Sequence, residues 1–104
     1  MVSRANPNRA KEVGAVALDA YARASLEAMI DRVKAKLAEL GPAVALHERE
    51  LAEAAILDAL AAIQEGKRAD KLRARQVELE HILLSLTETA AVTGDAPTRR
   101  GGDR

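Results

Sequence analysis

The sequence predicts an all-α protein, a three-helix up-down-up antiparallel bundle with a long first helix that is completed by self-association. Glycine and proline are concentrated at the few points where a helix would begin or end. Between these points the helix-favouring residues Ala, Leu, Glu, Lys and Arg dominate, and no stretch alternates apolar with polar residues as a half-buried strand does. The connections between the expected helices are short, which favours antiparallel neighbours.

The first helix is expected over residues 8–40, after a flexible arm at 1–7 and before Gly41 and Pro42. Its apolar residues recur at steps of three and four, which places them on one buried stripe: Leu26, Ile30, Val33, Leu37 and Leu40. A helix of about 34 residues spans on the order of 50 Å, longer than its neighbours. We therefore expect residues 8–20 to overhang and to be covered by a second copy or another protein.

The second helix is expected over residues 43–65, with Gly66 as a left-handed C-cap. Its segment LAEAAILDALAAI is apolar at nearly every angle around the helix axis, a pattern typical of a centrally buried helix. We expect Leu57 and Leu60 to contribute to the packing seam.

The third helix is expected over residues 69–93, with Asp70 as its N-cap. One stripe should face the bundle: Leu72, Leu79, Leu83 and Leu86. Gly94 and Pro97 then predict a disordered tail over 94–104. Residues 8–93 would form the single helical domain.

Composition limits the possible functions. Ala supplies 23 residues and Tyr21 is the only aromatic residue, so the core is thin and self-association would compensate for it. Sixteen basic residues balance sixteen acidic ones, so no overall field attracts nucleic acid or acidic lipid. Cysteine is absent, and no apolar run approaches the roughly 18 residues of a membrane span. We expect a cytoplasmic protein with no membrane partner.

A basic cluster, residues 67–75, surrounds Asp70 at the start of the third helix. Within it Arg68, Lys71 and Arg75 share a face that could contact nucleic-acid phosphate or another anion. The alternative is a solvated face, or pairing with the acidic residues of 39–65, where six acids accompany Arg49 alone. Both interpretations stay open at this stage.

Glu78 and His81 have the Glu-x-x-His spacing of carboxylate-bridged di-iron bundles, which indicates a possible metal site in a ferritin-like assembly. Both residues lie away from the Leu72 stripe. They would face an interior only if a homodimer covered the opposite side, where Val77, Leu84 and Ala91 form a second stripe. The solvated back of an ordinary amphipathic helix is the competing interpretation.

The spacing from Arg75 to His81 resembles the Arg-x(4–6)-His pattern of HEPN-type ribonucleases. The resemblance covers seven residues and implies that Arg75 and His81 would pair across a dimer to cleave RNA. The number of expected helices is small for that fold. No glycine-rich phosphate loop or nucleophile elbow is present, so we expect neither an enzyme nor a cofactor.

The sequence therefore predicts a non-enzymatic helical interaction or assembly protein, such as an adaptor, which binds another macromolecule through an apolar helical face. A homodimer is the favoured assembly, and another protein is the expected partner. A nucleic-acid-binding accessory protein using the basic cluster is the first alternative, and the ferritin-like metal assembly is the second.

Overall fold

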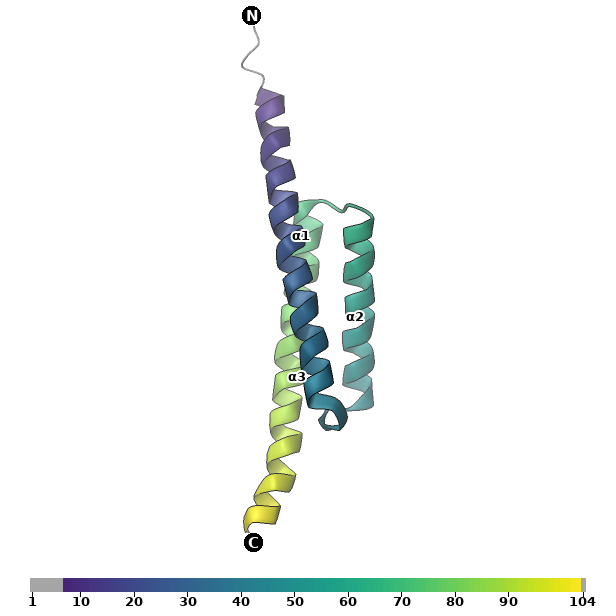
Figure 1. Cartoon of the computed structure of the whole chain (residues 1–104), viewed down its shortest axis with the longest axis vertical. Coiled ribbons are helices and arrows are strands. Elements are labelled where there is room, and N and C mark those ends of the chain that lie inside the picture. Colours follow the sequence, from purple (N-terminus) through teal and green to yellow (C-terminus); the bar gives the residue numbers. More distant parts are fainter. Residues whose placement is uncertain (1–6, 104) are drawn as a thin grey trace, which may run out of the picture.

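The computed structural model describes the backbone of residues 7–103 and the side chains of residues 17–92. Its elements are α1 (Pro7–Leu40), the 3-10 turn η1 (Gly41–Ala43), α2 (Leu46–Gln64) and α3 (Ala69–Asp103). Within this described part there is no strand, and the three α-helices pack against one another (Figure 1). The predicted all-α class is confirmed.

The helices differ in how far they extend along the molecule (Figure 1). α1 and α3 lie side by side, and α2 lies along this pair. The first turns of α1 project beyond the α2–α3 connection at one end, and the last turns of α3 project beyond the α1–α2 connection at the other. An overhang of α1 was expected, whereas that of α3 was not. The side chains of residues 8–16 lie outside the described residues, and so does the backbone of most of the predicted arm at 1–7.

The connection from α1 to α2 is organised around one carbonyl group. Gly41 has a φ of +49°, which favours glycine, and its carbonyl accepts the Val44 N–H at 3.2 Å. The same oxygen accepts a 2.9 Å hydrogen bond from Nη2 of Arg49. Because the short 3-10 turn occupies the residues after Gly41, α2 begins at Leu46 rather than at residue 43.

The predicted left-handed cap at Gly66 is confirmed, with a φ of +69°. The Lys67 N–H donates to the Ala62 carbonyl and the Gly66 N–H to the Ile63 carbonyl, both at 3.1 Å, which is the Schellman arrangement. The expected N-cap at Asp70 is wrong by two residues. The Arg68 carbonyl already accepts the first bonds of α3, so Asp70 lies in the first turn, where its carboxylate accepts the Lys71 N–H at 2.9 Å.

The end of α3 also differs from the prediction. The helix passes through Gly94 and Pro97 to Asp103, so the structure shows helix where a tail over 94–104 was expected. Glycine and proline cost about 1 and 3 kcal/mol relative to alanine in a helix interior. These penalties disfavour a helix without excluding it, whereas the prediction ended the helix at residue 93 because of them.

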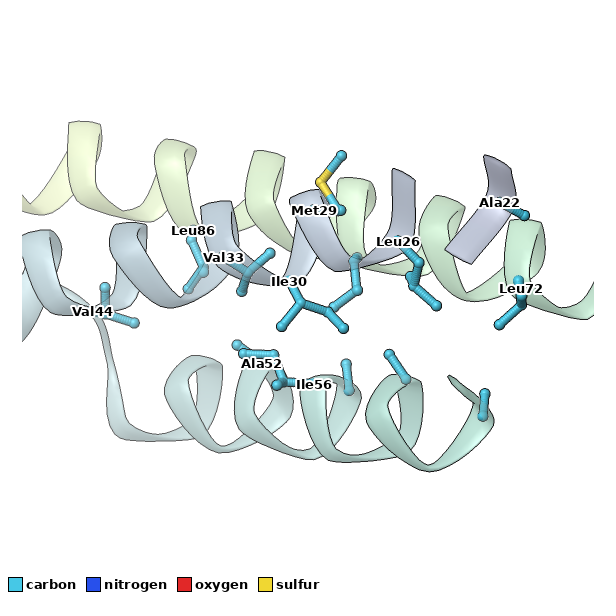
Figure 2. Close-up of a cluster of buried hydrophobic side chains, with 14 residues drawn as sticks. Ala22, Leu26, Met29, Ile30, Val33, Val44, Ala52, Ile56, Leu72 and Leu86 are labelled. Atoms are coloured by element: carbon cyan, nitrogen blue, oxygen red, sulfur yellow. The ribbon is translucent and has the colours of Figure 1, made fainter. Parts of the chain in front are cut away.

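The core lies where the three helices meet. Its largest fully buried side chains all belong to the predicted seam: Leu26, Ile30, Val33, Leu72, Leu79 and Leu86. Leu37, Leu60 and Leu83 are partly buried and pack against this core. Figure 2 shows Ile30 of α1 pointing toward α2, where Ala52 and Ile56 meet it. The placement of Leu57 in the seam is wrong, because its side chain is 68% exposed.

Candidate interaction surface

The buried residues of the helix α2 are mostly alanines, whereas several of its leucines are exposed. Its buried residues are Ala52, Ala55, Ile56, Ala59 and Ala62. Three of its leucines are exposed instead, at 71% for Leu46, 48% for Leu51 and 68% for Leu57. The expectation of a centrally buried α2 is therefore wrong. Alanine lets helices approach closely, and this alanine face is the one that packs on α1 and α3 (Figure 2).

An open groove runs between α1 and α2 beside one of these exposed leucines, Leu57. Its volume is about 460 Å³, and α1 lines it with Lys34 and Leu37. The α2 side of the groove consists of Glu53, Ile56, Leu57 and Leu60. Ile56 is buried and Leu37 and Leu60 are half-buried, so these three form an apolar floor. Leu57 stands exposed at its edge.

The two charged residues of the groove come from different helices and have opposite signs. Lys34 lies on α1 and Glu53 on α2, and both side chains are exposed. Neither forms an ion pair with any side chain in the described range 17–92. The cation nearest along α2, Arg49, is bound to the Gly41 carbonyl. Both groove charges are therefore accessible to a partner.

The residues of the predicted basic cluster differ in their ion pairs. Nε of Arg75 lies 2.9 Å from Oδ2 of Asp58, and its Nη1 lies 3.2 Å from Oε1 of Glu78. The first of these pairs joins α3 to α2, as the internal-pairing alternative expected. Arg68 and Lys71 are exposed and make no ion pair with the side chains of residues 17–92. Arg75 therefore differs from Arg68 and Lys71, because its guanidinium group is already ion-paired within the chain.

The predicted metal pair lies on the outer side of α3. Glu78 and His81 are both exposed, and the Glu78 carboxylate accepts the hydrogen bond from Arg75. Nowhere in the described part of the chain do three His, Cys, Asp or Glu side chains gather in a way that could hold a metal ion. Val77 and Leu84 beside them are 62% and 57% exposed, so the second stripe on α3 is uncovered in the single chain.

No model of a known protein family matches the chain, and no solved structure matches it. Among the described residues, no helix carries an apolar segment of the length that a bilayer requires. The surface chemistry of α1, α2 and α3 is therefore the basis for any functional proposal.

Three residues of the groove were not among the residues singled out from the sequence: Lys34, Glu53 and Ile56. These three residues come together only through the packing of α1 against α2, which no local sequence pattern contains.

Proposed function

We propose that the protein is a non-enzymatic helical interaction or assembly protein of the cytoplasm. In this proposal the chain is an up-down-up bundle completed by self-association, and it binds another macromolecule through an apolar helical face. One observation carries the proposal: α2 exposes Leu46, Leu51 and Leu57 while it buries alanines. The proposal includes no catalytic step and no cofactor.

The energetic reason lies in the size of the exposed side chains. Fully burying a leucine contributes about 1.5–3 kcal/mol, whereas an alanine offers far less apolar area. A chain that functioned as a monomer would be more stable if Leu57 were buried against its own core. The observed orientation is favourable when a second surface covers the leucines, because both faces of α2 are then buried.

The shape of the surface suits a helix as the bound element. α2 has 19 residues, which at 1.5 Å per residue is a length of about 28 Å. The groove beside it has an apolar floor and charged edges, the arrangement by which grooves receive amphipathic helices. A partner helix would insert apolar side chains against Leu37, Ile56 and Leu60.

The test compares three baits in capture of partners from a lysate: the natural chain, Leu57→Glu and Leu84→Glu. Leu57 and Leu84 are both exposed leucines, but only Leu57 lines the groove. Specific partners, including further copies of the chain, should be lost with Leu57→Glu and kept with Leu84→Glu. Equal capture by all three baits would contradict the proposal.

A second candidate function is an accessory role in nucleic-acid binding. It is favoured by Arg68 and Lys71, which are exposed and make no ion pair within the described side chains. Arg75 contributes less than expected, because Asp58 and Glu78 already neutralise its charge. Binding of this kind would depend steeply on salt.

A further inference from the structure

We propose that the occupant of the groove between α1 and α2 is the same groove of a second copy of this chain. The two copies are related by a two-fold axis that runs along the helices. In this arrangement α1 of each copy packs over α2 of the other, and the four helices form the interface. The inference rests on the proposed function, since it names the partner of the same apolar face.

The first argument is that the groove is self-complementary in shape. It contains both a projecting side chain, Leu57, and a hollow floor formed by Leu37, Ile56 and Leu60. A two-fold interface requires one patch to supply both halves of each contact. Here the axis lays Leu57 of each copy on the α1 side of the other groove, against Leu37. Each copy therefore inserts its Leu57 into the groove of the other.

The second argument comes from the charges. Lys34 and Glu53 line the same groove from opposite helices, and neither is paired within the described side chains. An axis along the helices lays α1 over α2 and therefore places Lys34 of one copy against Glu53 of the other, twice. An axis across the helices would lay α1 over α1, with Lys34 opposite Lys34, and like charges at an interface are unfavourable.

The third argument is the thin core of the single chain. Five of the buried core residues are alanines, all but one of them on α2. The alanine face leaves α2 with little apolar area against its own chain. A second copy in the groove would bury Leu57 and further cover Leu37 and Leu60, which adds apolar area without any change to the existing packing.

The experiment measures molar mass by sedimentation equilibrium over a range of concentrations, with circular dichroism to check folding. The natural chain should show twice the mass of one chain, and Leu57→Glu should show the mass of one. Because Leu57 is 68% exposed, that variant should keep its helical signal. Leu84→Glu, a matched change at a 57% exposed leucine of α3, should remain a dimer.

Charge exchange tests the direction of the axis. Lys34→Glu and Glu53→Lys should each weaken the dimer about tenfold or more, because two symmetric pairs become repulsive and every 1.4 kcal/mol is a factor of ten. Combining the two substitutions in one chain exchanges the two charges, so residue 34 is again opposite a residue 53 of the opposite sign. The dimer affinity should then return to near that of the natural chain. Neither residue is buried, so neither single variant should unfold.

Several results would overturn the inference. A natural chain that is monomeric at all concentrations would do so, as would a dimer that survives Leu57→Glu or dissociates with Leu84→Glu. A monomer whose capture of a different protein is lost with Leu57→Glu would remove this inference but keep the proposed function. A monomer that captures nothing through the groove would remove both.

Discussion

Replacing Leu79 by alanine should destabilise the fold more than any matched change on the outer side of α3. Leu79 is 0% exposed and lies seven residues from Leu72 and from Leu86, which are also fully buried. The substitution removes three carbon atoms, worth about 2.4 kcal/mol at roughly 0.8 kcal/mol per carbon. The cavity left behind adds to this loss, so the free energy of unfolding should fall by about 2–5 kcal/mol.

A domain of 104 residues has a total stability of roughly 5–15 kcal/mol, and a core rich in alanine places this one toward the lower end. Urea unfolding followed by circular dichroism measures the change. With a slope of about 2 kcal/mol per molar, the middle of the range for small proteins, the midpoint should fall by roughly 1–2.5 M. Measuring at several protein concentrations separates loss of folding from loss of association.

The control is Leu84→Ala, five positions further along the same helix, at a leucine that is 57% exposed. It should lower the free energy of unfolding by no more than about 1 kcal/mol, since the removed atoms are already largely in water. Equal midpoints for the two variants would refute the assignment of the buried side of α3. A larger loss with Leu84→Ala would mean that the outer stripe is the true seam.

Three further substitutions test the caps and the charges. Gly66→Ala should cost about 1–2 kcal/mol in thermal unfolding, because a φ of +69° is strained for a residue with a Cβ even though nothing lies within 4 Å of that position; a normal melting temperature would contradict this. Arg75→Ala should cost about 0.2–1 kcal/mol by removing the half-exposed pair with Asp58, and a double-mutant cycle that shows no coupling at low salt would contradict it. If the chain binds nucleic acid, Arg68→Ala with Lys71→Ala should lower the slope of log K against log salt by roughly 2, and an unchanged slope would exclude these side chains from the contact.

Periodicity predicted the inner faces of α1 and α3 correctly for a physical reason. On each helix the large apolar residues recur at steps of three and four along one side, and that side is therefore favoured for burial. Leu26, Ile30 and Val33 on α1 and Leu72, Leu79 and Leu86 on α3 are buried accordingly. Gly66 was predictable for a different reason, since a positive φ selects glycine.

The side of α2 that faces inward could not be predicted in the same way. Apolar residues surround its axis, so the pattern has no direction, and Leu57 was placed in the seam on apolar character alone. The end of α3 failed for another reason, because Gly94 and Pro97 disfavour helix only by finite amounts. The position of Lys34 beside Glu53 depends on how α1 and α2 pack, which no local pattern contains.

The orientation of α2 links the fold to the proposed role. Close packing against α1 and α3 requires a small-residue face, which Ala52, Ala55, Ala59 and Ala62 provide. Leu46 and Leu57 of the same helix lie outside this face, and Leu57 is at the edge of the groove. If α2 served only to complete the single chain, polar residues at Leu46 and Leu57 would cost that chain little, because both side chains are about 70% exposed. The presence of a large apolar side chain at both positions is the feature that a covering surface explains and an isolated bundle does not.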